Sequence, residues 1–591
     1  MIAPTELVLL PRPRHLDVTG DGPPTTTEAV EHQATDLEPQ GFELHISDTT
    51  INLRYRDDAG LRYGRATLAQ LRAQFPDRLP ALSIKDWPDF ATRGYMLDVS
   101  RGRVPTRDTL ERIVGLLELL RVNHFQLYTE HTFAYTAHET VWRDASPMTP
   151  DDIRWLDERC TEAGIELAAN QNCFGHFEHW LKHDAYRDRA ELAEGFELMG
   201  RHRPATTLAP TQDNADFALD LVRELVPNFS SRRVNIGCDE TWELGRGVSK
   251  AAADAKGKGR VYLEHLHRLV NPLIADGLDV QFWGDIIANH PELATELPQG
   301  ATAVAWWYEA PWDPEEQERL LWEVGDRFLD AGVDLSKKLG GFAGEAAPFL
   351  ESSYPLWVAP GTGTWRSLLG RLRTAYGNML DTVNVGLSGG VEGVLITDWG
   401  DGGHPQPPSV TFPPLAYGAA LSWCRDANHD LNVPAVLDHF VFPGTNIGAA
   451  LEALGHLNDR TGQIAFNSSP LQLALEPNAH HVGVGDPDPK ALAGVVDDID
   501  ALIATVNSGS GAFGDHEIVQ NELTAAARQA RHGAWRLLRQ AGAPAPDTAA
   551  MRADLAETTE LHRRAWLSRA RPGGMETWMT TLTALAKTYD S

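Results

Sequence analysis

The sequence predicts an α/β protein whose central part is a (β/α)8 TIM barrel, preceded by a small α/β domain and followed by an α-helical domain. Three observations lead to this fold class. Short apolar segments alternate with amphipathic helical segments between residues 90 and 426, as in a parallel sheet, and eight such repeats are typical of a closed barrel. Polar and aromatic residues collect where the apolar segments end. The pattern changes on both sides, which sets the expected domains at residues 1–89, 90–426 and 427–591.

Residues 1–89 are predicted to form a small α/β unit. The stretches 42–47 and 51–56 alternate apolar and polar side chains, which is the two-residue period of half-buried strands. The segment 60–74 then carries Leu61, Tyr63, Leu68 and Leu71 at helical spacing. The prediction is a β-hairpin followed by a helix.

Eight strands and most of the helices between them can be placed in the central part of the chain. The predicted strands are residues 94–98, 124–129, 165–171, 234–239, 279–283, 301–307, 348–357 and 394–399. The predicted helices are residues 106–120, 150–163, 213–225, 260–276, 315–329 and 364–385. The residues that follow the strands include Glu130 and His131, residues 170–176, Asp239 and Glu240, Trp283 and Asp285, Trp306, Tyr308 and Glu309, and Trp399, Asp401 and His404. A doubly wound open sheet would place its ligand at one switch point, so this spread favours the barrel.

After residue 426 the chain becomes rich in alanine and leucine. Helices are predicted at residues 446–457, 490–506, 516–540 and 551–566. The result is a helical C-terminal domain, for which the sequence leaves three roles open: it packs on the barrel, forms the interface of a homodimer, or extends the site.

Composition narrows the class of protein. With 591 residues and 42% hydrophobic content, the chain has material for several cores and suits a large enzyme. Its 82 acidic and 52 basic residues give a net charge of -30, which disfavours nucleic acid and anionic membranes as partners. The N-terminal segment lacks the pattern of a secretory signal, so we expect a soluble cytoplasmic protein.

Cysteine and tryptophan usage adds two further expectations. The four cysteines lie far apart without a CxxC pair, which predicts reduced thiols and neither a disulfide framework nor a zinc knuckle. The 17 tryptophans favour a carbohydrate partner, because sugars stack on aromatic rings, although large cores also use tryptophan.

The acidic pair Asp239-Glu240 is the candidate catalytic centre. It follows an apolar run, residues 234–238, and acids at the end of a buried strand are usually retained only where chemistry uses them. Paired carboxylates are the working groups of glycoside hydrolysis. On an extended backbone, neighbouring side chains point to opposite sides, so the two acids are expected to act on two faces of one bond. The alternative is an ordinary surface dipeptide.

These stretches together resemble glycoside hydrolase family 20, the β-N-acetylhexosaminidases. The motif Val-Asn-Ile-Gly-Cys-Asp-Glu at 234–240 is similar to the acidic pair of that family, and Arg-Gly-Tyr-Met-Leu-Asp-Val-Ser-Arg at 93–101 is similar to its first barrel strand. Further similar stretches are residues 60–71, 164–176, 282–285, 304–306 and 398–401. The resemblance covers roughly residues 40–425, and the helical tail resembles a subset of bacterial members.

The resemblance implies a substrate-assisted mechanism that needs no metal and no cofactor. In that family the 2-acetamido oxygen of the sugar attacks its own anomeric carbon. Glu240 would then be the general acid and base, and Asp239 would orient and stabilise the acetamido nitrogen. A neighbouring Asp239 carboxylate would also raise the pKa of Glu240 and keep it protonated.

The resemblance also implies a set of sugar-binding residues. Arg93 would donate to the 3- and 4-hydroxyls of the terminal sugar, unless it is a structural residue at the base of the barrel. Asp401 would accept from the 4- and 6-hydroxyls, unless its loop is a mere turn. The residues expected to wall the pocket are Trp283, Trp306 and Trp399.

Histidine 176 would tune the acid/base through a carboxylate. With His179 it forms an H-x-x-H pattern, but no third ligand follows at a recognisable spacing, so a metal site is not predicted.

The sequence departs from the family pattern at three places. Glu130 stands where an aspartate is common and would make the same hydrogen bonds with a longer arm. Cys238 replaces a glycine before the acidic pair. The seventh strand lacks the tyrosine that holds the acetamido oxygen, so Tyr308 or Tyr354 would substitute, or the pocket accepts a different 2-substituent.

The expected function is that of a retaining exo-acting β-N-acetylhexosaminidase acting on a β-N-acetylglucosaminide or galactosaminide. Three alternatives remain from the residues alone. One is the same fold acting on a differently 2-substituted hexosamine, another is a barrel that binds sugars without cleaving them, and the third is a metal-dependent hydrolase.

Overall fold

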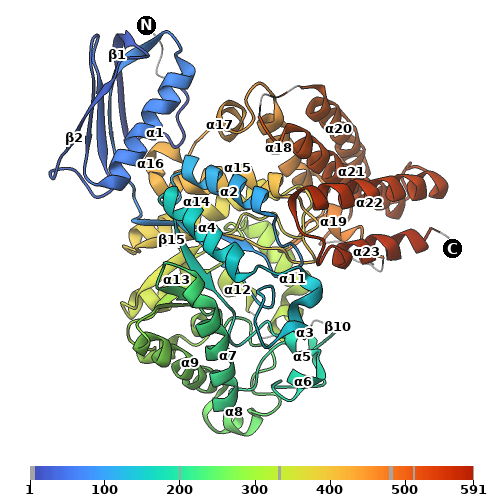
Figure 1. Ribbon diagram of the computed structural model, residues 1–591. Helices are drawn as coiled ribbons and strands as arrows, with labels where there is room; N and C mark the ends of the chain where they lie inside the picture. The colour runs from blue at the N-terminus through green and yellow to red at the C-terminus, as the bar shows by residue number, and fades with distance from the viewer. Residues whose placement is uncertain are drawn as a thin grey trace.

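A computed structural model describes residues 7–198, 201–330, 334–477, 484–509, 511 and 513–589 of the chain. It shows an N-terminal sheet with one helix, a central barrel, and a group of helices at the C-terminal end (Figure 1). The predicted fold class is therefore confirmed.

The N-terminal part is a five-stranded sheet covered by a single helix. Its strands are β1 (His15–Pro24), β2 (Ala29–Gln33), β3 (Phe42–Ile46), β4 (Ile51–Tyr55) and β5 (Arg78–Asp86), in the order β1-β5-β3-β4-β2. Strands β3 and β4 pair antiparallel with Ile46 opposite Ile51, as the predicted hairpin requires. The helix α1 (Asp58–Gln74) buries Leu68 and Leu71 in the core that contains Leu44 of β3. The sequence analysis missed β1, β2 and β5.

The barrel is closed and its strand pairs are parallel. Its strands are β6 (Thr92–Asp98), β7 (His124–Tyr128), β8 (Glu166–Asn170), β11 (Arg233–Asn235), β12 (Asp279–Trp283), β13 (Thr302–Trp306), β14 (Leu356–Ala359) and β15 (Gly393–Asp398). The principal outer helices are α2 (Arg107–Leu119), α4 (Pro150–Glu162), α7 (Gln212–Leu225), α9 (Lys258–Ala275), α11 (Pro314–Asp330), α14 (Leu372–Ser388) and α15 (Phe412–Trp423). Because all eight strands run the same way, their carboxyl ends meet at one mouth.

The seventh predicted strand, residues 348–357, is placed too early. Residues Ala343–Glu351 form helix α13, and the strand β14 begins only at Leu356. A short apolar run does not distinguish a buried strand from a buried helix by periodicity, which explains the error.

The helices of the C-terminal part pack beside the barrel (Figure 1). They include α17 (Val433–Phe440), α18 (Ile447–Gly455), α20 (Pro489–Ser508), α21 (His516–Gln540), α22 (Thr548–Arg569) and α23 (Glu576–Lys587). The backbone oxygen of Arg569 accepts hydrogen bonds from the Thr106 N–H and the Thr109 hydroxyl at the start of α2. Of the three roles left open by the sequence, packing on the barrel is therefore observed. Within the described residues, no helix is both long and apolar enough to cross a membrane.

Candidate active site

The acidic pair lies on a tight turn that follows β11. The strand ends at Asn235, before the predicted limit of residue 239, and Gly237, Cys238 and Glu240 have positive φ angles of 67°, 72° and 49°. The expectation of an extended backbone with the two acids on opposite sides is therefore wrong. The turn instead brings both carboxyl groups to one histidine, since His176 Nε2 lies 3.1 Å from Asp239 Oδ2 and 3.6 Å from Glu240 Oε2.

Asp239 is held as an anion by two side chains of the loop after β8. The amide of Asn172 donates to Oδ1 at 2.7 Å, and His176 Nε2 donates to Oδ2. Burial of Asp239 opposes its charge, but His176 and Asn172 outweigh this effect and lower the pKa of the carboxyl group. Asp239 in turn outweighs the effect of burial on His176 and raises the pKa of the imidazole to about 9. His176 and Asp239 thus form an imidazolium–carboxylate pair at neutral pH.

The pKa of Glu240 is shifted in the opposite direction. Burial raises the pKa of its carboxyl group, and the charges of Asp239 and Asp401 raise it further while His176 opposes them. About a third of the side chain, 34%, remains exposed, so an entering ligand can reach it. The neighbouring pair therefore combines an ionised acid with one that tends to hold its proton.

A third acid, Asp285, supports this turn from the end of β12. Its Oδ2 accepts the backbone N–H of Glu240 at 3.2 Å. Burial, reinforced by Asp239, raises the pKa of Asp285 well above its usual range. The sequence analysis noted Asp285 at a strand end but gave it no role.

The predicted site residue Arg93 does not lie at the mouth of the barrel, which is a correction. It stands near the start of β6, where its guanidinium donates to the backbone oxygens of Arg121 and Phe90 and to the Tyr63 hydroxyl of the N-terminal sheet domain. A strand of seven residues is roughly 20 Å long, so its two ends serve different faces of the barrel. The alternative of a structural role at the barrel base is the one that the contacts support, through hydrogen bonds in place of an ion pair.

The arginine at the mouth is Arg101, three residues beyond the end of β6. It pairs with Asp98 at 3.2 Å and with Glu130 at 3.4 Å, and its Nε lies 3.9 Å from Asp401. The guanidinium also lies over the ring of Trp399, 5.0 Å from its centroid. Arg101 belongs to the same quoted motif as Arg93, and strand direction would have identified it.

Aromatic side chains form a wall beside the acids. Four of the predicted residues meet there: Trp283 and Trp399 have ring centroids 5.9 Å apart, and Trp306 stacks on Tyr308 at 5.1 Å. The indole N–H groups of the three tryptophans are buried and have no hydrogen-bond partner among the described residues. Aromatic residues of the same cluster that the sequence analysis did not assign to the site are Tyr128, Trp357 and Trp365.

The two tyrosine candidates are distinguished by their positions. The Tyr308 hydroxyl is buried in the aromatic cluster and has no hydrogen-bond partner among the described residues. The Tyr354 hydroxyl donates to the backbone oxygen of Pro298, and its ring packs near Phe282 in the outer core. Of the two, only Tyr308 has its hydroxyl in the aromatic wall.

Glu130 and Asp401 lie on either side of Arg101. Glu130 is buried and accepts a hydrogen bond from the Tyr128 hydroxyl at 3.0 Å. Asp401 is more open, with 38% of its side chain exposed. Both predicted residues are therefore brought to the mouth, where Glu130 is buried and Asp401 is partly exposed.

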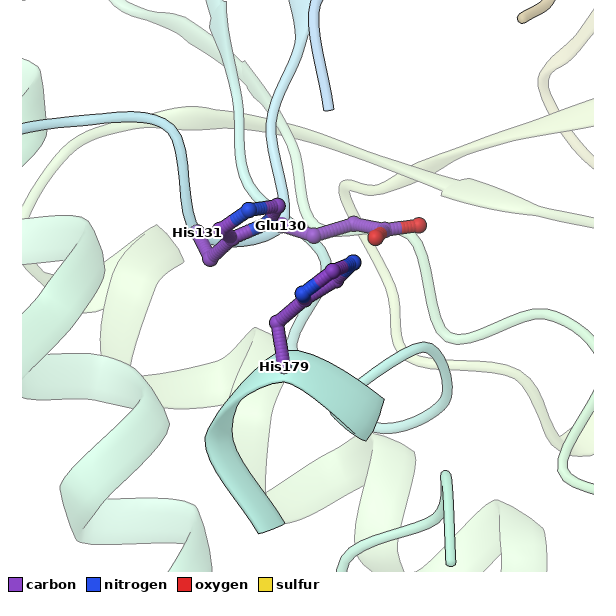
Figure 2. Close-up of side chains that lie close together, drawn as sticks. All are labelled: Glu130, His131 and His179. Atoms are coloured by element: carbon purple, nitrogen blue, oxygen red, sulfur yellow. The ribbon is translucent and has the colours of Figure 1, made fainter. Parts of the chain in front are cut away.

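One group of side chains has the composition of a metal site. Figure 2 shows Glu130, His131 and His179, whose ligand atoms lie within 4.8 Å of one another. The two imidazoles stack with centroids 3.8 Å apart and an interplanar angle of 14°, so their in-plane lone pairs do not converge on one point. Arg101 already pairs with Glu130, and Lys182 lies beside His179. These donors as arranged fit a cation poorly.

The two histidines of the H-x-x-H pattern have different partners, since His176 contacts Asp239 and His179 contacts His131.

Fold and site together define a class of protein, a (β/α)8 barrel with two dissimilar carboxyl groups beside an aromatic wall, which is the arrangement that glycoside hydrolysis uses. Comparison with known families agrees. The pattern "Glycosyl hydrolase family 20, domain 2" matches residues 9–87, and "Glycosyl hydrolase family 20, catalytic domain" matches residues 90–325, together just over half of the chain. The chain belongs to glycosyl hydrolase family 20.

Curated relatives carry hexosaminidase names. Hexosaminidase D of Bos taurus is 25% identical over 221 residues, which are 36% of this chain and 62% of that protein. Hexosaminidase D of Homo sapiens is 27% identical over 240 residues, 39% of this chain and 48% of that protein. The matched parts are thus less than two thirds of either relative. The beta-N-acetylhexosaminidase of Cellulomonas fimi is 28% identical over 362 residues, 56% of this chain and 67% of that protein.

Solved structures share the fold. The chitobiase of Flavobacterium johnsoniae matches with a TM-score of 0.55 at 15% identity, over 94% of this chain and 97% of that chain. The exo beta-N-acetylglucosaminidase of Vibrio harveyi in complex with N-acetylglucosamine matches with a TM-score of 0.53 at 14% identity, over 76% and 78% of the two chains. At these identities the likeness shows the fold alone.

Proposed function

We propose that the protein is a retaining exo-β-N-acetylhexosaminidase that uses substrate assistance. The observation that carries the proposal is the paired carboxyl groups on one histidine, with the pKa of Asp239 lowered and that of Glu240 raised. These opposite pKa shifts place an anion, Asp239, and a proton donor, Glu240, next to each other on the turn after β11. Family membership and the hexosaminidase names of the relatives support the same activity.

The reaction would take two steps. In the first, the 2-acetamido oxygen of the sugar attacks the anomeric carbon, the glycosidic bond breaks, and the leaving oxygen takes the proton of Glu240. The Asp239 carboxylate stabilises the acetamido N–H as the ring becomes an oxazolinium ion. In the second step, Glu240 as a carboxylate takes a proton from water, whose oxygen attacks the anomeric carbon and reopens the ring. Two inversions at one carbon give retention of configuration.

The remaining side chains would bind the terminal sugar. Arg101 is placed to donate to hydroxyl groups, and Asp401 at the rim is placed to accept from them. The hydroxyl of Tyr308, in the aromatic wall, would be the donor for the acetamido oxygen. The aromatic rings supply the stacking faces on which sugars pack.

A second candidate is hydrolysis of a hexosamine with another 2-substituent. It is favoured by one observation, the absence of a tyrosine from β14, where Trp357 and Val358 stand instead. If this candidate holds, aryl glycosides with an N-acetyl group are poor substrates and a modified amino sugar is released faster.

The test is hydrolysis of aryl β-N-acetylglucosaminide and β-N-acetylgalactosaminide by wild type, Asp239→Asn and Glu240→Gln. We expect Asp239→Asn to lower kcat about 100–1000-fold on every substrate, because it removes charge stabilisation. We expect Glu240→Gln to lower kcat about 100–10,000-fold with an alkyl aglycone, but much less with a nitrophenyl aglycone, which leaves without a proton.

A thiazoline mimic of the oxazolinium should inhibit the wild type competitively. Release of neither amino sugar by a folded wild type would refute the proposed activity and leave the modified-substrate or sugar-binding alternatives. Equal losses for Glu240→Gln across all leaving groups would refute its role as the acid.

A further inference from the structure

Asn467, in the C-terminal part of the chain, contacts the aromatic wall of the site. It lies on the loop between η6 (Leu457–Arg460) and α19 (Pro470–Leu473), well beyond the last barrel strand. Its side-chain oxygen accepts the indole N–H of Trp365 at 2.8 Å. Trp365 is 1% exposed, and among the described tryptophans of that wall it is the one whose N–H donates to the C-terminal part of the chain.

Asn467 is itself held firmly by a buried ion pair. Its backbone N–H donates to Glu309 Oε1 at 2.9 Å, and Arg371 Nη1 donates to the same oxygen at 2.7 Å. Glu309 and Arg371 are 3% and 5% exposed. The φ angle of Asn467 is 48°, a left-handed conformation that asparagine tolerates better than most residues. The loop is therefore fixed at both its backbone and its side chain.

These contacts meet at Tyr308. The ring of Trp365 stands edge-on to the Tyr308 ring, with centroids 5.0 Å apart and an interplanar angle of 80°. Glu309 is the next residue along the chain. Tyr308 is thus bounded by Trp365 through space and by Glu309 through the backbone, and Asn467 contacts both of these neighbours.

We propose that Asn467 is a positioning residue, through which the C-terminal helical part sets the place of Trp365 and Tyr308 in the sugar pocket. The proposal rests on the proposed hexosaminidase function for its kinetic readout. Loss of the Asn467 oxygen leaves the buried Trp365 N–H without a partner, and the indole would shift to find one. Because Tyr308 packs on that indole, its hydroxyl would move with it.

The kinetic test uses Asn467→Gly, which keeps the left-handed backbone and removes the acceptor, and Asn467→Asp, which restores an acceptor oxygen. We expect Asn467→Gly to raise KM about five- to tenfold with a smaller change in kcat, because the Trp365 N–H loses its acceptor and Arg371 Nη2 loses a longer hydrogen bond of 3.5 Å to the same oxygen. Asn467→Asp should recover KM to within about threefold of the wild type. A role in folding alone would reduce the amount of active enzyme, which lowers kcat and leaves KM unchanged.

Two further variants make the assignment specific. Ser353→Gly is the matched control, because Ser353 is exposed and also left-handed, with a φ angle of 55°, but lies outside this network. Its KM should equal that of the wild type. Trp365→Phe removes the N–H while keeping a ring, so its effect and that of Asn467→Gly should not add in the double variant.

A second readout does not depend on hydrolysis. Backbone hydrogen exchange of residues 360–371 should be faster in Asn467→Gly than in the wild type and unchanged in Ser353→Gly. If the wild type releases no amino sugar, the proposed function fails. The positioning role of Asn467 is then tested by the hydrogen exchange of residues 360–371 without any kinetic measurement. Unchanged KM together with unchanged exchange in Asn467→Gly overturns the proposal. If that variant does not fold, Trp365→Phe takes its place, and an unchanged KM in it overturns the proposal equally.

Discussion

At the mouth of the barrel, one imidazole contacts two neighbouring carboxyl groups whose pKa values are shifted in opposite directions. Asp239 receives a direct hydrogen bond from His176 and another from Asn172, so its pKa falls. Glu240 lies 3.6 Å from the same imidazole, and burial and the charge of Asp239 raise its pKa. The difference therefore comes from contacts made by each side chain and not from the residue types, which have nearly equal pKa values in water.

Replacement of His176 by asparagine should move the whole pH–activity profile to higher pH. The imidazolium lowers the pKa of both carboxyl groups, so its removal raises both, and the acidic and alkaline limbs of kcat/KM should both shift upward. The measurement is kcat/KM against pH with an aryl hexosaminide. As a control, His183→Asn, at a partly buried position just before α6 (Asp184–Arg187), should leave both limbs in place.

The same variant tests the charge of His176 through stability. The pKa of His176 is about 9 in the folded protein against about 6.5 unfolded, so its stabilisation is present in full below pH 6.5 and is lost as the pH rises through 9. The free energy of unfolding of His176→Asn, measured in urea, should therefore fall less than that of the wild type over this window. If the free energy of unfolding falls equally with pH in the variant and the wild type, His176 is neutral in the folded protein.

Arg93, in β6, and Arg101, just beyond its end, should respond in different ways to substitution. Arg101→Lys removes a planar donor at the mouth and should raise KM about 10–100-fold with little change in stability. Arg93→Met leaves several buried carbonyl groups without donors and should lower the free energy of unfolding by about 2–4 kcal/mol, with KM unchanged. If Arg93→Met folds fully and its KM is nevertheless raised, the prediction that Arg93 binds the terminal sugar would be correct.

At the scale of secondary-structure elements, the site depends on close approach between two loops. The loop after β8 carries Asn172 and His176, and the turn after β11 carries the acidic pair. Gly175 lies where a Cβ atom would stand only 2.3 Å from the Asp239 backbone oxygen. The absence of a side chain at Gly175 therefore helps the two loops to meet.

The variant Gly175→Ala should therefore displace the turn and lower kcat/KM by at least about 100-fold, as expected for a misplacement near 1 Å at a reacting group. The barrel should persist, as measured by circular dichroism. The matched control is Gly115→Ala, an exposed position in α2 where the added methyl group meets nothing within 4 Å. That control should keep full activity and gain about 0.5–1 kcal/mol in stability.

At the scale of the whole molecule, the C-terminal helices support several loops of the barrel mouth. Gly102 directly follows Arg101, and its backbone touches that of Gly574, which lies between α22 and α23. Gly403, in the loop of Asp401, lies against Thr577. Together with the Asn467 contact, these approaches connect residues more than 100 positions apart, so the mouth is built by two parts of the chain.

The variant Gly574→Ala should move the C-terminal segment at residue 574 away from the loop of Arg101 and Gly102. A Cβ atom there would lie 2.0 Å from the Gly102 oxygen, so the loop must move, and we expect KM to rise about tenfold or more. Gly542→Ala is the control, because Gly542 also has a positive φ angle, 69°, but has nothing within 4 Å of its added Cβ. Equal kinetics for the two variants would indicate that backbone strain, and not the contact, is responsible.

The sequence alone determined the alternation of strands and helices in the central part, the barrel, the helical C-terminal part and most of the residues at the mouth. These follow from local periodicity and from the rule that parallel strands end at one face, both of which can be deduced from neighbouring residues. The motif resemblance led to Arg93 in place of Arg101, although the rule that the site lies at the carboxyl ends of the strands, applied to the same nine residues, would have selected Arg101.

Only the tertiary structure decided how the acids are oriented and what holds them. The positive φ angles at Cys238 and Glu240 arise from contacts with the loop of Gly175 and with Asp285, which are distant in sequence. The choice of Tyr308 over Tyr354 and the reach of Asn467 to Trp365 are likewise packing results. Such contacts depend on which surfaces meet when the chain closes, and no local pattern in the sequence encodes them.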